Sequence, residues 1–131
     1  MTEAKNKTII VVDDEPDVAK VLEQLFIDDG FTVKVFENGK KALEEINKER
    51  PDLVVTDILM PMLNGLKLCE AIKSDHKTAK IPVILLTAVY REEHHVEMGF
   101  QHGADAYFSK PFNPARVLEV AKQLLDQVTP D

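Results

Sequence analysis

Apolar and polar positions follow two alternating patterns along this chain. Short runs that are almost wholly apolar and rich in β-branched residues are separated by longer stretches with apolar residues at helical spacing. The short runs predict five strands, at residues 8–12, 32–36, 53–56, 83–86 and 104–108. Strands that alternate with helices are typical of βαβ units, and a continuous apolar run indicates a strand covered on both faces. The pattern therefore predicts an α/β domain with a parallel sheet between two layers of helices.

The longer stretches predict five helices. They run from Pro16 to Gly30, from Asn38 through Ile46, over 64–74, over 91–102, and from Asn113 through Leu125. Asn38 and Asn113 are of a type that caps helix N-termini, and proline is favoured in the first turn. The helix over 91–102 is weakly amphipathic and contains Gly99, so we expect it to pack loosely and to move readily.

Polar residues stand where the predicted strands end. They are Asp13 and Asp14 for the first strand, Asp57 for the third, Thr87 for the fourth and Lys110 for the fifth. Right-handed crossovers place the carboxyl ends of parallel strands along one edge, where open α/β sheets bind ligands. Each residue alone is explained as a turn residue, a helix cap or a solvated charge. Their convergence on one edge is what predicts a functional site.

Three carboxylates at one edge repel each other unless a proton or a cation neutralises them. Mg²⁺ or Mn²⁺ suits such an all-oxygen site, since no Cys or His lies near these strand ends. Asp57, at the end of a central strand, fits the nucleophile of a phosphoryl transfer, and Asp13 and Asp14 fit ligands for metal and water. Lys110 supplies a further positive charge and Thr87 a hydroxyl donor. The sequence thus predicts metal-assisted phosphorylation of Asp57.

Composition narrows the class of protein. The 131 residues contain no linker or low-complexity stretch, so we expect one domain over 1–131 with a core over about 7–127. A net charge of −7 argues against direct nucleic acid binding by this chain. No signal sequence and no run near the roughly 20 apolar residues of a membrane span is present, which predicts a cytoplasmic protein without a membrane partner. Cys69 is expected to be a buried thiol, and the four histidines are expected at the surface: His76, His94, His95 and His102.

Several motifs in this order resemble the receiver domain of two-component response regulators. They are Asp13-Asp14 after the first strand, Asp57 in DILMPMLNG, Thr87-Ala88 in LLTA and Lys110-Pro111 in FSKPF. The resemblance covers about residues 7–127. It implies a single doubly wound five-stranded sheet, (βα)5, with the flavodoxin-like strand order 2-1-3-4-5. It also implies a cis peptide bond between Lys110 and Pro111.

The resemblance implies a role for each site residue. Asp57 would accept a phosphoryl group from a histidine kinase or a histidine phosphotransfer protein, and Lys110 would contact that group. Mg²⁺ would be bound by Asp14, Asp57 and the backbone carbonyl of Leu59, with Asp13 acting through water.

A switch pair is implied in the same way. The hydroxyl of Thr87 would move to the phosphoryl group, and the ring of Tyr107 would turn inward into the space vacated. An unknown downstream partner or effector domain would read the face built from the helix over 91–102, the last strand and the last helix. For Tyr107 the alternative is a ring that only covers the core.

Two departures from the family pattern concern the lifetime of the phosphorylated form. Leu59 and Val89 are apolar at positions that often carry polar residues in the family. Because these positions flank the path of attacking water, we expect a longer-lived phosphorylated form than in relatives with polar residues there.

Two other functions share parts of this pattern. A phosphohydrolase of the haloacid dehalogenase type also uses an aspartate at a strand end, but it needs a second aspartate where Leu59 stands. A flavodoxin-like nucleotide binder needs a glycine-rich phosphate loop, and the first loop here reads DDEPD. We therefore expect a signalling switch rather than a turnover enzyme, with its kinase, its output and homodimerisation on phosphorylation left open.

Overall fold

One five-stranded sheet forms the centre of the molecule. The structure is a computed structural model that describes residues 7–60, 62–88 and 103–127. The strands are β1 Thr8–Val12, β2 Thr32–Phe36, β3 Leu53–Asp57, β4 Val83–Ala88 and β5 Ala106–Lys110. Their spatial order is β2-β1-β3-β4-β5, and each neighbouring pair is parallel. The predicted α/β fold with strand order 2-1-3-4-5 is confirmed.

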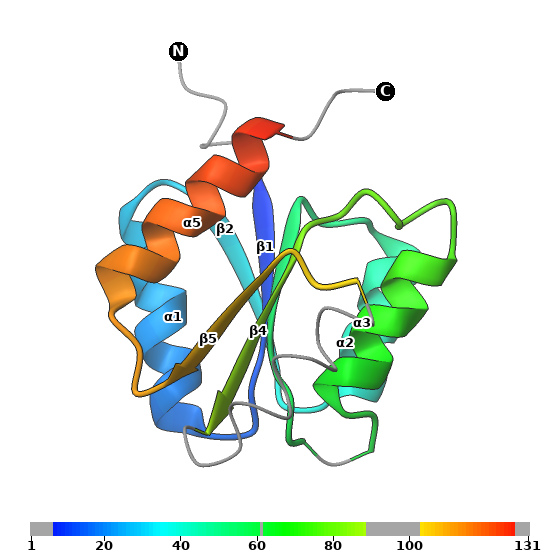
Figure 1. Cartoon of the computed structure of the whole chain (residues 1–131), viewed down its shortest axis with the longest axis horizontal. Coiled ribbons are helices and arrows are strands. Elements are labelled where there is room, and N and C mark those ends of the chain that lie inside the picture. The colour runs from blue at the N-terminus through cyan, green and yellow to red at the C-terminus, as the bar shows by residue number, and fades with distance from the viewer. Residues whose placement is uncertain (1–6, 61, 89–102, 128–131) are drawn as a thin grey trace.

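Helices cover both faces of this sheet. They are α1 Pro16–Asp28, α2 Gly39–Lys48, α3 Gly65–Ser74 and α5 Pro114–Gln127. In Figure 1, α1 and α5 lie on one face, while α2 and α3 lie on the other. The helix predicted over 91–102 falls outside the described residues. None of the described helices combines the length and the apolar character that crossing a membrane requires.

The continuous apolar runs of the central strands are explained by two cores. On β1, Ile9 and Val11 belong to the core under α1 and α5, while Ile10 and Val12 belong to the core under α2 and α3. All four side chains are fully buried. Burial of an aliphatic side chain of this size contributes about 1.5 to 3 kcal/mol, so both cores favour this register of β1. The strand that carries Asp13 at its end is therefore held firmly from both sides.

The helix caps predicted at Asn38 and Asn113 are present, and Asn64 forms a further cap. Asn38 and Asn64 stand before α2 and α3, and each side-chain oxygen accepts a hydrogen bond of 2.9 Å from a backbone N–H three residues on. Asn113 accepts one of 2.9 Å from the N–H of Ala115 at the start of α5. Gly30, just after α1, has a φ of 96°, which favours glycine. These local signals fix where the chain leaves and re-enters the sheet.

Three strand predictions were wrong at their ends. The third strand extends one residue further than predicted, through Asp57. The fourth strand extends through Thr87 to Ala88, and the fifth covers Ala106–Lys110 instead of 104–108. The reason is backbone pairing, because Thr87 lies opposite Ser109 and Ala88 opposite Lys110 in the parallel ladder. Polar side chains at a sheet edge hide this pairing from an apolar pattern. Lys110 is therefore the last residue of a strand, and the bond that follows it, to Pro111, is cis as expected.

Candidate functional site

The carboxyl edge of the sheet gathers three aspartates. Asp13 and Asp14 follow β1, and Asp57 ends the neighbouring strand β3. One carboxylate oxygen from each lies within 4.8 Å of the others. Asp13 and Asp57 are buried, at 2% and 6% exposure, whereas Asp14 is exposed. The acidic cluster predicted from the strand ends is thus present.

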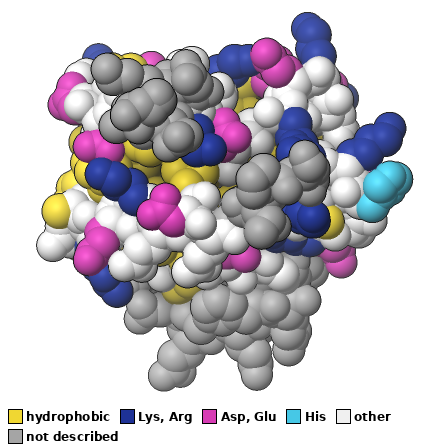
Figure 2. Space-filling model, turned by 90° about the horizontal axis from the view of Figure 1, so that it is seen from above, with side chains coloured by type: hydrophobic (Ala, Val, Ile, Leu, Met, Phe, Trp, Pro, Cys, Tyr) yellow, Lys and Arg dark blue, Asp and Glu magenta, His cyan; other side chains and the backbone are white. Residues whose placement is uncertain are grey.

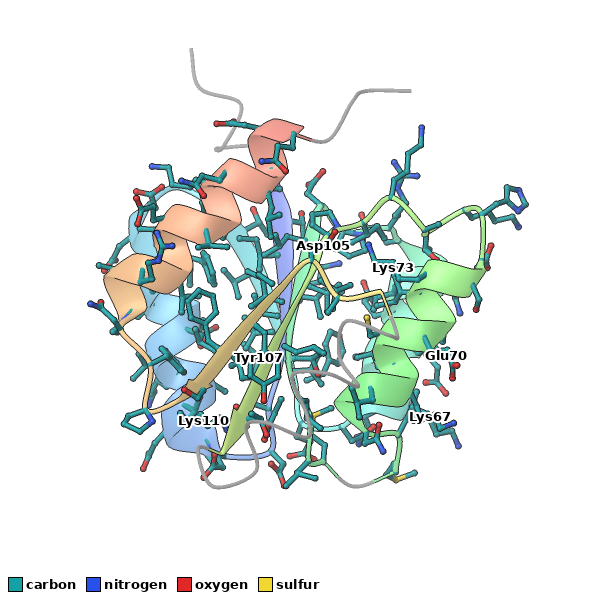
Figure 3. All side chains as sticks on the ribbon, viewed as in Figure 1. Lys67, Glu70, Lys73, Asp105, Tyr107 and Lys110 are labelled. Atoms are coloured by element: carbon teal, nitrogen blue, oxygen red, sulfur yellow. The ribbon has the colours of Figure 1, made fainter. Side chains whose placement is uncertain are left out.

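A single lysine meets this cluster from the far strand. Lys110 ends β5, and Figure 3 shows it at the end of that strand away from Asp105. Its Nζ lies 3.0 Å from Asp13 Oδ2 and 3.2 Å from Asp57 Oδ2. It is closest, at 2.6 Å, to Oε1 of Glu15. Three carboxylates from two segments therefore surround one ammonium group.

Burial and crowding shift the pKa values of these groups. Burial, followed by the charge of Asp13, raises the pKa of Asp57 to about 6, although Lys110 acts in the opposite direction. Burial likewise raises the pKa of Asp13 despite a hydrogen bond from the backbone of Glu15. Burial alone would lower the pKa of Lys110, but its bonds to Glu15 and Asp13 raise it on balance. The site therefore raises the pKa of Asp13 and Asp57 and keeps Lys110 charged.

The turn after β1 explains how Asp13 and Glu15 reach their places. Asp13 Oδ1 accepts a hydrogen bond of 2.9 Å from the backbone N–H of Glu15, which closes a tight aspartate turn. Pro16 then begins α1, where its missing N–H costs no helical hydrogen bond. Glu15 therefore stands directly at the mouth of the site, at the N-cap position of α1.

The segment after β3 passes very close to Asp57. The N–H of Gly65 donates a 2.8 Å hydrogen bond to the carbonyl of Ile58. A Cβ atom on Gly65 would lie only 2.1 Å from the carbonyl oxygen of Asp57. Only glycine allows this approach, so the start of α3 fixes the backbone that carries the candidate nucleophile.

The acidic cluster fits a divalent cation. Asp13 Oδ2 is buried and, although the Lys110 charge is 3.0 Å away, it makes no proper hydrogen bond with any described residue. A buried polar atom without such a bond is unfavourable unless a ligand satisfies it. Clustered carboxylate oxygens are the ligands that Mg²⁺ and Mn²⁺ prefer. The donor set therefore suits the predicted metal.

An open groove of about 810 Å³ runs beside the cluster, between α1 and the segment that joins β5 to α5. Its floor includes Asp57 and Lys110, and its walls include Val18, Val21 and Phe112. Leu59, whose backbone carbonyl was a predicted metal ligand, lines the same groove with 41% of its surface exposed. The groove gives an incoming group access to the carboxylate of Asp57.

The two predicted switch residues lie beside this site. Thr87 is fully buried on β4, one position beyond the residue that pairs with Asp57. Tyr107 is half-buried on β5, lies opposite Leu85, and packs against the core under α2 and α3. Thr87 and Tyr107 therefore lie on the adjacent strands β4 and β5. β4 is also the neighbour of β3, which carries Asp57, and β5 itself carries Lys110.

Other predicted residues have clear positions. Cys69 is fully buried, and burial raises the pKa of its thiol to about 11, as befits a structural cysteine. His76 has 93% of its side chain exposed. His94, His95, His102 and Val89 lie outside the described residues.

Glu15 is the residue that the strand-end pattern missed. Its partner Lys110 is 95 positions away, and the adjacent Asp13-Asp14 pair accounts for the local acidity without it. Only the turn that begins at Asp13 brings it to the lysine, and an apolar pattern carries no signal for such a contact.

Comparison with known proteins gives a consistent result. The family model described as the response regulator receiver domain matches residues 9–122. The alkaline phosphatase synthesis transcriptional regulatory protein PhoP of Bacillus subtilis is 35% identical over 120 residues, which are 92% of this chain and 49% of that protein. The DNA-binding response regulator MtrA of Mycolicibacterium smegmatis is 36% identical over 110 residues, 84% of this chain and 46% of that protein.

A solved structure agrees in fold. The signal receiver domain of a signal transduction histidine kinase from Syntrophus aciditrophicus has a TM-score of 0.88 and 31% identity, and the match covers 95% of this chain and 94% of that chain. The chain spans about half the length of the two curated relatives described above.

Proposed function

This chain belongs to the response regulator receiver domain family of two-component signalling, and we propose that it is a switch operated by phosphorylation of Asp57. One observation carries the proposal. The buried carboxylate of Asp57 ends a central strand, 3.2 Å from the ammonium of Lys110, and opens onto a groove. A nucleophile on a rigid strand with a cation beside it is what phosphoryl transfer requires, because catalysis of this reaction is mostly positioning and electrostatics.

In the proposed reaction, a carboxylate oxygen of Asp57 attacks the phosphorus of a phosphohistidine on a histidine kinase or a histidine phosphotransfer protein. The phosphorus–nitrogen bond breaks, and the departing imidazole nitrogen takes a proton from solvent. The product is an aspartyl phosphate. Because the pKa of Asp57 is about 6, most of its carboxylate is ionised at neutral pH and able to attack.

Asp13, Asp14, Asp57 and the carbonyl of Leu59 would hold Mg²⁺ or Mn²⁺ in the working protein. When bound, the cation offsets the crowded negative charge and polarises the phosphoryl oxygens. The support for this is the carboxylate oxygens within 4.8 Å and the unsatisfied Asp13 Oδ2. Lys110 supplies the second positive charge, directed at the phosphoryl oxygens from β5.

The output would pass through Thr87 and Tyr107. The hydroxyl of Thr87 would turn toward the new phosphoryl group, and the ring of Tyr107 would move into the space vacated. A downstream partner or effector domain would then read the face of β5, α5 and the segment over 91–102. A shift from about 1:99 to 99:1 takes roughly 5.5 kcal/mol of differential interaction. A dianion beside a lysine, a hydroxyl and a metal ion is a reasonable source of that energy.

The same residues disfavour turnover of separate phosphoesters by this chain. Leu59 stands where a haloacid dehalogenase phosphohydrolase needs its general acid, and it offers no proton. The apolar Leu59 and Val89 would also hinder water from attacking the phosphorylated aspartate, so we expect a long-lived phosphorylated form. We further infer that the protein works in the cytoplasm, without direct contact to nucleic acid or membrane, and that homodimerisation on phosphorylation is one route of output.

The test is NMR of the purified protein with Mg²⁺ and beryllofluoride, a mimic of the phosphoryl group, beside an Asp57→Asn control. We expect amide shift changes that extend from Asp57 through Thr87 to Tyr107 in the wild type and are absent in the control. No change in the wild type with Mg²⁺ present would overturn the proposed switch and leave a receiver fold that binds partners without phosphorylation.

A further inference from the structure

The shortest ion pair of Lys110 is the one with Glu15, which the phosphorylation chemistry described above does not use. The Nζ–Oε1 distance is 2.6 Å, against 3.0 Å to Asp13 and 3.2 Å to Asp57. Glu15 occupies the N-cap position of α1, but its side chain makes no capping hydrogen bond. Its carboxylate is directed to the lysine of a distant strand instead of to the N–H groups of its own helix.

Exposure argues that this contact is not there for stability. The side chain of Glu15 is 59% exposed, whereas those of Asp13 and Asp57 are 0% and 8% exposed. Exposed ion pairs contribute little to folding because water already solvates both charges well. The two buried aspartates hold Lys110 at the site whether or not Glu15 is present.

The geometry creates competition for Lys110. An ammonium group has three hydrogens, and here three carboxylates surround it. A phosphoryl group on Asp57 brings new acceptor oxygens to the same ammonium. Lys110 already donates hydrogen bonds to Glu15 and Asp57 and lies 3.0 Å from Asp13 Oδ2, so the phosphoryl oxygens compete with these carboxylates for one ammonium group. Glu15 is the exposed competitor, and its side chain is free to swing into solvent.

Charge acts in the same direction. When ionised, the four acids of the site carry four negative charges: Asp13, Asp14, Glu15 and Asp57. Lys110 and one divalent cation together supply three positive charges, which leaves an excess of one negative charge. Glu15 supplies that excess at the mouth of the groove, since it lines the groove together with Asp57 and Lys110. An anionic phosphodonor approaches against this charge.

We propose that Glu15 is a positioning residue that holds Lys110 in the unphosphorylated protein and must release it before the ammonium can pair with a phosphoryl group. The inference rests on the proposed phosphorylation of Asp57. Glu15 then sets how readily the site is filled: it slows phosphoryl entry and weakens binding of phosphoryl mimics, while the fold is unaffected.

The test uses acetyl phosphate as donor at saturating Mg²⁺. The Asp57 carboxylate attacks the phosphorus, the bond from phosphorus to the acyl oxygen breaks, and acetate leaves. We expect Glu15→Gln to raise the rate of phosphorylation and the affinity for beryllofluoride by about twofold to fivefold, the range for loss of one exposed ion pair. Glu15→Asp keeps the charge but is one methylene shorter, so it should also be faster than wild type. Thermal unfolding of both variants should match wild type.

Asp17→Asn is the matched control. Asp17 lines the same groove and is exposed, but it is not among the ion-pair partners of Lys110. We expect the phosphorylation rate of Asp17→Asn to stay within about 1.5-fold of wild type. The NMR shift of Lys110 Nζ should change in Glu15→Gln but not in Asp17→Asn.

Four results would contradict the proposal. If Asp17→Asn accelerated phosphorylation as much as Glu15→Gln, the cause would be the negative charge of the groove and not the contact with Lys110. A wild-type rate in Glu15→Asp, which keeps the charge, would lead to the same conclusion. Normal phosphorylation of wild type with no change in Glu15→Gln would overturn this inference while the proposed function stands. Failure of wild type itself to take up a phosphoryl group would overturn the proposed function, and this inference with it.

Discussion

The sheet has an amino edge, where its parallel strands begin, and a carboxyl edge, where they end. Acidic residues serve opposite purposes at these two edges. At the amino edge each acid has its own donor: Asp52 accepts a 2.8 Å hydrogen bond from the N–H of Thr8, and Asp105 accepts one of 2.8 Å from the N–H of Val83. Asp105 also lies 2.9 Å from the ammonium of Lys73. At the carboxyl edge three carboxylates share Lys110. Figure 3 shows Asp105, near Lys73, and Lys110 at opposite ends of β5.

Lys73 illustrates how complete the bonding at the amino edge is. Its ammonium donates to the carbonyls of Ala79 and Ile81 as well as contacting Asp105. Figure 2 views the molecule from above, onto the amino edge of the sheet, and shows acidic and basic side chains interspersed on that face. Acids that are fully bonded hold strands in place. Acids crowded around too few donors retain an unfavourable energy that a cation or a phosphoryl group can relieve.

The largest change in stability is expected from removing Asp105 at the amino edge. Asp105→Ala removes the acceptor of the buried Val83 N–H and the counter-charge of Lys73, so we expect a loss of about 3 kcal/mol in the free energy of unfolding. Urea unfolding measures it. Asp105→Asn keeps an acceptor for Val83 and should lose about half as much. A loss below about 1 kcal/mol in Asp105→Ala would show that this edge is not held by its acids.

At the carboxyl edge, removing the charge of an acid should increase the free energy of unfolding instead of decreasing it. Because the pKa of Asp57 is raised from 3.8 to about 6, the folded protein binds its proton more tightly than the unfolded chain does. The stabilisation is fully present below pH 3.8 and is lost as the pH rises through 6. Without metal at pH 7, Asp57→Asn should therefore be more stable than wild type by about 2 kcal/mol.

The pH profile separates this cause from a general gain in packing. The advantage of Asp57→Asn should shrink as the pH falls from 6 to 4, measured by chemical unfolding in the presence of a chelator. An Asp52→Asn variant at the amino edge should show no such gain at neutral pH. A less stable Asp57→Asn at pH 7 would mean that the Lys110 pair outweighs the burial and crowding of Asp57.

The smallest change in stability is expected from adding Mg²⁺ to the metal-free protein. At about ten times its dissociation constant, Mg²⁺ should stabilise the wild type by about 1.4 kcal/mol, since it binds only the folded protein. The thermal midpoint should rise in the wild type and much less in Asp57→Asn, which lacks one ligand charge. An equal rise in both proteins would place Mg²⁺ away from the aspartate cluster.

The sequence predicts this molecule best where one local signal decides the outcome. The sequence predicts that β1 is covered on both faces and that Asn38 and Asn113 cap helices, and the structure confirms these predictions. The strand order came from the family resemblance, because periodicity does not reveal which strands are neighbours. The aspartate cluster was predictable because a parallel sheet places the carboxyl ends of all its strands at one edge, and the strand order makes β1 and β3 neighbours there.

What the sequence missed depends on contacts between distant segments. The true ends of β4 and β5 follow from the pairing of Thr87 with Ser109, where polar side chains conceal a strand. The role of Glu15 depends on Lys110, and the role of Asp105 on the first N–H of another strand. No periodicity in a single segment reports such pairs.

The order of the strands also bears on how the protein is made. The aspartates of the site directly follow β1 or end β3, but their lysine comes from β5, the last strand, 53 residues after Asp57. A ribosome thus releases the whole acidic cluster well before its only direct counter-ion among the described residues. A nascent chain stopped ahead of β5 has no Lys110 to pair with these acids. Synthesis of the last strand is therefore also the step that completes the chemical site.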